Sequence, residues 1–152
     1  MERTIKVGEK EMSFKSSAAT NIFYKKAFGE DLIVKLTEYT KNLKELKKMQ
    51  TDVAELQKSG KSQEEILDTM NEMMASDAFL STQNFANETL PKLAYVMYLE
   101  ANEKIGDLFS KLNENGYLTW LMNMNQDELL DVTGEVMDIW QSGARTHSKP
   151  KN

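Results

Sequence analysis

Hydrophobic and polar residues alternate one by one in two short stretches close to the N-terminus. The apolar residues of these stretches are Ile5, Val7, Met12 and Phe14. A period of two is typical of a β-strand with one covered face, and Gly8-Glu9 between the stretches suits a two-residue type II′ turn. The pattern predicts a β-hairpin over residues 3–15, and its apolar face needs a helix to cover it.

From residue 16 onward, the apolar spacing changes to three and four, which is the period of a helix. Ser16 or Ser17 is placed to cap a first helix, which we expect to cover the hairpin and to stop at Gly29. The helix after it carries a narrow apolar seam between flanks of mixed charge. The seam consists of Leu32, Leu36, Tyr39, Leu43, Leu46, Met49, Val53 and Leu56. Such a seam fits a helix lying on its own domain, an exposed hairpin arm or a surface for self-association.

After a break at Gly60, a capping box of Ser62 and Glu65 predicts the start of the next helix. The apolar residues of that helix are Ile66, Leu67, Met70, Met73 and Met74. Residues 76–89 are polar enough to predict a connection rather than a helix.

Pro91 marks the start of, or a kink in, the most hydrophobic segment, a helix that is apolar on nearly every side and is therefore expected at the centre of the fold. A short helix is predicted to end at Asn115-Gly116. The last helix is predicted to run from a capping box of Asn125 and Glu128 to Gly143. The sequence thus predicts a mainly α fold, one helical domain over residues 1–143 with the N-terminal hairpin, and a flexible basic tail at 144–152.

Composition narrows the chemistry of this fold. The 152 residues include 19 Lys and Arg, 24 Asp and Glu, no cysteine and a single histidine, His147. Without cysteine there is no disulfide or thiolate metal site, and the glycines never cluster as in a phosphate-binding loop. Asn123, Asn125 and Asp127 resemble the start of a calcium loop, but Glu128 stands where the loop needs glycine. We therefore predict no catalytic, cofactor or metal site and no enzyme activity.

Charge and hydropathy also bear on partners. Lys41, Lys44, Lys47 and Lys48 form a basic turn, but acidic residues surround it and the net charge is −5, which does not favour nucleic-acid binding. No stretch approaches the roughly 18 apolar residues of a membrane span. The remaining hypothesis is that function lies in surfaces that bind other proteins, in the cytoplasm.

Methionine is enriched where such a surface is expected, because its flexible thioether adapts to varied partners. The same residues also suit the filling of a core. As candidate contact residues, we select the set Leu43, Leu46, Met49, Met70, Met73 and Met74.

Four blocks of sequence, in order, resemble a known family. They are T-I-K-V-G-E-K-E-M-S-F-K, A-A-T-N-I-F-Y-K-K-A-F-G-E-D-L, L-P-K-L-A-Y-V-M-Y-L-E-A-N and G-E-V-M-D-I-W-Q-S-G-A-R-T. The chain is similar, over most of residues 3–147, to the tail assembly chaperones of long-tailed phages and prophages of Gram-positive bacteria. It departs from their pattern at Pro91 and Gly134, where the helices of such proteins are usually more regular.

The resemblance implies a small helical protein of the bacterial cytoplasm that is absent from the mature virion. Members of the family bind the long helical tape-measure protein, keep it soluble and help to recruit tail-tube subunits. Many of them also occur in a longer form made by a translational frameshift, and this chain would be the short form. Coating a long client would need many copies, so homo-oligomers are expected. The alternatives are an adaptor that dimerises through the Leu32 to Leu56 seam and a small regulatory protein such as an anti-repressor.

Overall fold

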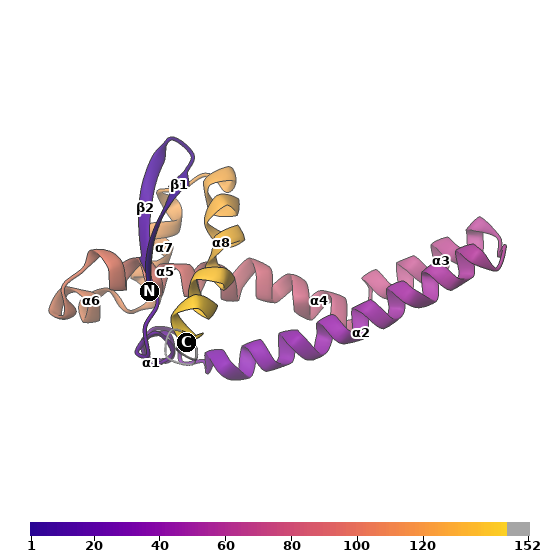
Figure 1. The fold of residues 1–152 in the computed structure, drawn as a ribbon, viewed down its shortest axis with the longest axis horizontal. Coiled ribbons are helices and arrows are strands. Elements are labelled where there is room, and N and C mark those ends of the chain that lie inside the picture. The colour runs from indigo at the N-terminus through magenta and orange to yellow at the C-terminus, as the bar shows by residue number, and fades with distance from the viewer. Residues whose placement is uncertain (146–152) are drawn as a thin grey trace, which may run out of the picture. The chain divides into compact units, whose positions relative to one another are not determined.

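A computed structural model describes residues 1–145 and has a helix-dominated α+β fold with an N-terminal β-hairpin, as the sequence predicts (Figure 1). The elements in chain order are β1 (Glu2–Val7), β2 (Lys10–Lys15), α1 (Thr20–Phe28), α2 (Leu32–Lys58), α3 (Gln63–Met74), α4 (Asp77–Asn84), the π-helical segment η1 (Phe85–Thr89), α5 (Leu90–Asn102), α6 (Ile105–Lys111), α7 (Glu114–Met122) and α8 (Gln126–Arg145).

Contacts divide the chain into two compact units, which we describe separately. The first unit comprises Met1–Leu32 and the chain from Glu88 onward, and the second comprises Ile33–Asn87. The tail predicted at 144–152 lies outside the described residues, apart from its first two positions, which continue α8.

The β-hairpin has the register and the turn that the sequence predicts. β1 and β2 are antiparallel, with Val7 opposite Lys10, so that Gly8-Glu9 forms a two-residue connection. Gly8 has a φ of 62°, whereas no described residue other than glycine has a positive φ. A positive φ at the first turn position alone is the signature of the type II′ turn.

The apolar face of the hairpin is covered by two helices distant in sequence, and not by the adjacent helix α1 as we expected. Val7 and Phe14 are fully buried, because β2 packs against α5 and β1 against α8. α1 packs against α5 instead. The guanidinium of Arg3 in β1 adds ion pairs to Asp138 (2.7 Å) and Glu135 (3.3 Å) of α8.

α5 is the centre of the first unit. Most of its residues are buried: Pro91, Leu93, Ala94, Tyr95, Val96, Met97 and Leu99. The hairpin, α1, α6, α7 and α8 all contact this helix. A helix that is apolar on every side needs cover from every side, and the central position predicted from the sequence is confirmed.

The start of α1 is held by hydrogen bonds to a half-buried carboxylate of α5. The residue before the helix is Ala19, which makes no side-chain cap. Ser17 and Thr20 donate their hydroxyl hydrogens to the two carboxylate oxygens of Glu100 in α5, each at 2.6 Å. The helix begins later than the predicted cap at Ser16 or Ser17 implies, but Ser17 Oγ still accepts the Ala19 N–H (3.1 Å) just before α1, while Ser16 Oγ donates to the Trp140 carbonyl (3.3 Å).

Two glycines that we predicted to end helices lie inside helices. α8 continues past Gly143, where an added Cβ would lie 2.6 Å from Ser16 Cβ and closer still to its Oγ. Gly116 lies in the first turn of α7, where an added Cβ would lie 2.6 Å from the Lys111 carbonyl oxygen. Both glycines are therefore positions of close approach between segments, and not helix stops.

Residues 77–89 are helical, which corrects the polar connection predicted over residues 76–89. Ser76 Oγ accepts a hydrogen bond from the Phe79 N–H (3.2 Å) and caps α4. Ala78, Thr82 and Phe85 follow at helical spacing and are buried. The helical period was hard to recognise in the sequence, because Thr82, one of the three buried residues, is polar.

Gly143→Ala should destabilise the protein by roughly 1–3 kcal/mol, because the new methyl group would overlap Ser16. Gly134→Ala, in the same helix, is the matched control, since no heavy atom lies within 4 Å of an added Cβ there. That change should stabilise the protein by about 0.5–1 kcal/mol. Urea denaturation of both variants measures the difference, and equal effects would contradict the close packing of Gly143.

Stability should depend on pH through Glu100. Burial raises the pKa of this carboxyl above its ordinary 4.5, although hydrogen bonds from Ser17 and Thr20 lower it in part. Because the folded state then holds the proton more tightly, the stabilisation is complete below pH 4.5 and is lost as the pH rises through the folded-state pKa.

Glu100→Gln should remove this dependence, so that the difference in unfolding free energy between wild type and variant falls as the pH is raised from about 4 to 7. Ser17→Ala removes one of the hydrogen bonds that lower the pKa and should extend the decline to higher pH. Denaturant titrations at several pH values test both expectations. A difference that stays constant with pH would exclude this role of Glu100.

Candidate partner-binding site

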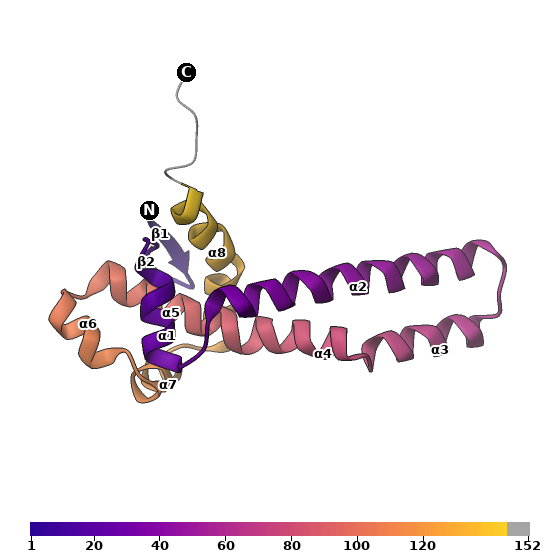
Figure 2. The same ribbon diagram turned by 90° about the horizontal axis from the view of Figure 1, so that it is seen from below.

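The second unit is an antiparallel helical hairpin that holds all six candidate contact residues. α2 runs one way, and α3 followed by α4 returns along it, as both views show (Figure 2). Gly60, with a φ of 74°, lies in the turn between α2 and α3. The rings of Tyr39 and Phe85 stack at 4.1 Å between centroids, and Asn42 Nδ2 donates to Ser81 Oγ (2.8 Å).

The predicted seam of α2 is the inner face of this hairpin. From residue 37 to residue 58, only the inner positions have reduced exposure: Tyr39, Asn42, Leu43, Leu46, Met49, Val53 and Leu56. Val53 is the most buried of them, with 9% of its surface exposed, whereas the others are half-buried. The seam therefore packs within the chain, but thinly.

The structure separates the six selected residues into two groups. Leu43, Leu46 and Met49 lie half-buried on the inner face of α2, and Met73 lies half-buried on α3. Met70 and Met74 are exposed, by 36% and 46%. The six side chains thus do not form one continuous surface.

α3 carries two parallel stripes of mainly apolar residues, and no residue of this helix is fully buried. The half-buried inner stripe consists of Ile66, Thr69 and Met73. The outer stripe consists of Leu67, Met70 and Met74 and is exposed, with Leu67 at 59%. Leu67 belongs to the exposed surface and was missing from our selection. Its spacing of three and seven to the two exposed methionines was the signal for it.

The outer stripe lies on a helix of one charge sign. The acidic residues of α3 are Glu64, Glu65, Asp68 and Glu72, and Gln63–Met74 contains no lysine or arginine. Glu64 and Glu65 lie in the first turn, after the Ser62 cap whose Oγ accepts from the Glu65 N–H (3.3 Å). Carboxylates are favourable there because they complement the helix dipole. Asp68 and Glu72 have no such local reason.

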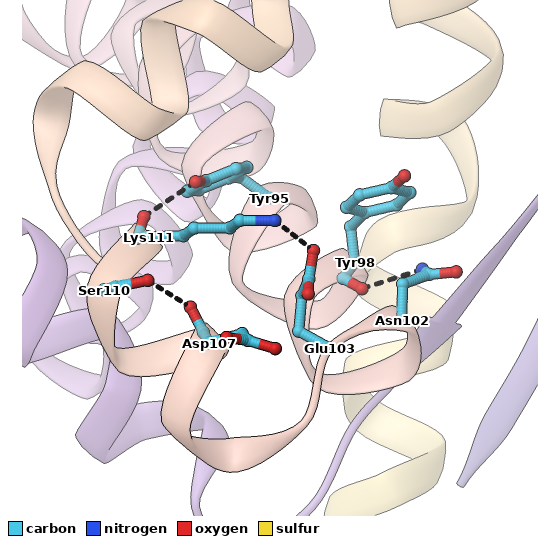
Figure 3. A network of polar contacts seen from close by, with 7 residues as sticks. All are labelled: Tyr95, Tyr98, Asn102, Glu103, Asp107, Ser110 and Lys111. Carbon is cyan, nitrogen blue, oxygen red and sulfur yellow. Dashed lines mark hydrogen bonds and ion pairs between the residues drawn. The ribbon is translucent and has the colours of Figure 1, made fainter.

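A second candidate is a cleft of about 440 Å³ in the first unit, beside three aromatic residues, Tyr95, Tyr98 and Trp120. Trp120 packs against Tyr95 and Tyr98, with ring centroids 5.5 and 5.7 Å apart. Figure 3 shows polar groups beside this cleft: Lys111 forms an ion pair with Glu103, and the Tyr95 hydroxyl donates to the Lys111 carbonyl (2.7 Å).

The polar groups of this cleft bind one another and so tie α6 to α5. Burial raises the pKa of Tyr95 to about 12, so the phenol is protonated at neutral pH and acts as a hydrogen-bond donor. The Lys111 ammonium is neutralised by Glu103. Because the groups satisfy each other, the cleft gives no strong support for a reactive site.

The comparisons do not assign the chain to a group of known proteins. No protein-family model, no curated protein and no solved structure matches it. Among residues 1–145, no helix has the length and apolar character needed to cross a membrane, and no three acidic or histidine side chains are grouped for metal binding. The exposed apolar side chains of the outer stripe make it the candidate site that geometry favours.

Proposed function

We propose that this protein is a tail assembly chaperone of a long-tailed phage or prophage. It would bind the tape-measure protein through the outer stripe of α3 and assist assembly of the tail tube. The observation that carries the proposal is the row of exposed Leu67, Met70 and Met74 on a helical hairpin. Exposed apolar rows that a protein does not cover itself are typical of surfaces that bind another chain.

The division of the chain into units supports this proposal. The four blocks of the family resemblance fall on β1 and β2, on α1, on α5 and on α8, all of which belong to the first unit. The outer stripe lies in the second unit, on α3, which none of the four blocks covers. The first unit would then be the scaffold that the chain shares with the family, and the helical hairpin of the second unit would hold the client.

The chemistry of the stripe suits a long helical client. A tape-measure chain exposes apolar helical faces that otherwise associate with one another, and a helix laid against such a face covers it. Two of the three stripe residues are methionines, whose thioethers adapt to faces that differ in sequence. The seam of α2 is packed within the hairpin, which leaves less of it for the alternative adaptor that dimerises through this seam.

Met70→Glu/Met74→Glu should abolish co-purification with the tape-measure protein while leaving the circular-dichroism melt unchanged. Both side chains are exposed, so the charges should cost the fold little. If these methionines are among the few anchor residues of the interface, the loss of each should cost about 2 kcal/mol, or roughly 30-fold in affinity. Co-expression of the two proteins with an affinity tag on the client measures the loss.

Two control variants separate a loss of client binding from a loss of stability. Met122→Glu changes a methionine of α7 that is 86% exposed, and it should leave client binding intact. Met73→Glu changes the inner stripe and should lower the melting temperature. If Met70→Glu/Met74→Glu lowers the melting temperature as Met73→Glu does, then the outer stripe belongs to the hairpin packing and the proposal loses its site.

The proposal also predicts weak self-association, because a long client needs many copies along its length. Sedimentation velocity at increasing concentration should show a rising average mass. A strictly monomeric profile at high concentration would contradict this part.

At the level of the gene, the proposal expects a very long helical reading frame immediately downstream, whereas a neighbouring regulator gene would favour the adaptor or regulatory alternative.

A further inference from the structure

We infer that the outer stripe and the acidic residues beside it accept an amphipathic helix with a basic flank, one whose apolar seam is bordered by lysine or arginine. This inference rests on the proposed function only in taking α3 as the contact surface. It adds the chemistry of the partner, which the exposed methionines alone do not define.

The acidic side chains are arranged along one side of the stripe. Successive residues of a helix are turned by about 100° about its axis. Counted from Leu67 about the axis of α3, Glu64, Asp68 and Glu72 therefore lie at about 60°, 100° and 140°. The inner stripe, which faces the rest of the hairpin, occupies the other side. A helix docked on the outer stripe would therefore meet apolar side chains along its seam and carboxylates along one flank.

This acidic row is unfavourable for α3 by itself. Glu64, Asp68 and Glu72 follow one another at intervals of four, and like charges at that spacing repel within a helix. None of these carboxylates, nor that of Glu65, forms an ion pair or a side-chain hydrogen bond within residues 1–145. Where a sequence breaks a local rule without compensation in its own fold, a functional reason is the expectation. Cations supplied by a partner provide the missing compensation.

A second copy of the chain fits this surface less well. The most basic segment of the hairpin is α2, with lysines at 41, 44, 47 and 48. However, no apolar residue larger than alanine is exposed on α2 between residues 37 and 58, because its seam faces inward. A second copy could offer cations from this stretch of α2, but no exposed apolar seam lies beside them to meet the outer stripe. A separate basic amphipathic helix offers both.

Two synthetic helical peptides of about 18 residues, or five turns, provide the test. They share one leucine seam and differ only in their flanks, which carry lysine in one peptide and glutamate in the other. Fluorescence anisotropy against the full-length protein at low ionic strength should show about tenfold tighter binding of the lysine peptide, and the preference should shrink in high salt. Equal affinities of the two peptides would overturn the inference.

Charge reversal locates the effect on α3. Asp68→Lys/Glu72→Lys should reverse the peptide preference. The helix should persist by circular dichroism, because the lysine at position 72 lies in the last turn of α3 and suits its dipole, and the lysine at position 68 lies four residues after Glu64, a spacing at which opposite charges attract. Glu45→Lys/Asp52→Lys makes the same change of charge on exposed positions of α2 and should keep the preference. A preference that survives reversal on α3 would overturn the inference.

The outcomes distinguish this inference from the proposed function. If the tape-measure protein is lost in Met70→Glu/Met74→Glu but the two peptides bind equally, the proposed function stands and the basic partner is wrong. If the lysine peptide is preferred but the tape-measure protein does not bind, the inference stands and the proposed function is wrong. Self-association of the wild type that disappears in Asp68→Lys/Glu72→Lys would assign the surface to a second copy and overturn the inference.

Discussion

The burial of α5 is the constraint on which the first unit depends. A helix with apolar residues on every side cannot be satisfied by one neighbour, so the hairpin, α1, α6, α7 and α8 each cover part of it. This need explains why the hairpin packs on helices that are far away in sequence. It also explains the close approaches at Gly116 and Gly143, because segments that converge on one helix leave room for a backbone but not for a methyl group.

Two sets of polar groups that accompany this burial are paired, and the pairs join particular elements, whereas the hydroxyl of buried Tyr24 has no hydrogen-bond partner within residues 1–145. Glu100 receives the hydroxyl hydrogens of Ser17 and Thr20 and so holds the start of α1 on α5. At the other end of α1, the Lys92 ammonium lies 3.2 Å from a Glu30 carboxylate oxygen. Buried or half-buried polar groups are costly unless they are bonded, and these bonds make one arrangement of α1 on α5 preferable to its neighbours.

The sequence predicted correctly those features that depend on residues only a few positions apart. The type II′ turn at Gly8 and the capping box of Asn125 and Glu128, whose side chains each accept the other's N–H at 2.8 and 3.0 Å, are of this kind. The failures share another cause. Whether Gly143 stops a helix or admits Ser16 against it depends on a segment more than a hundred residues away, which no local pattern contains. On α3, the inner and outer stripes have the same helical spacing, so periodicity could not show which of the two packs within the helical hairpin.

The two units also differ in how much of their surface is already used. The first unit buries large side chains completely, such as Phe14, Leu93 and Ile139, whereas α3 buries none. A helix without a fully buried residue gains little from its own fold, and isolated helices of about a dozen residues are marginal in water. A partner that covers the outer stripe would bury part of this surface and relieve the repulsion along the acidic row. The same features that make α3 a weak part of the fold would therefore make binding of another chain favourable for it.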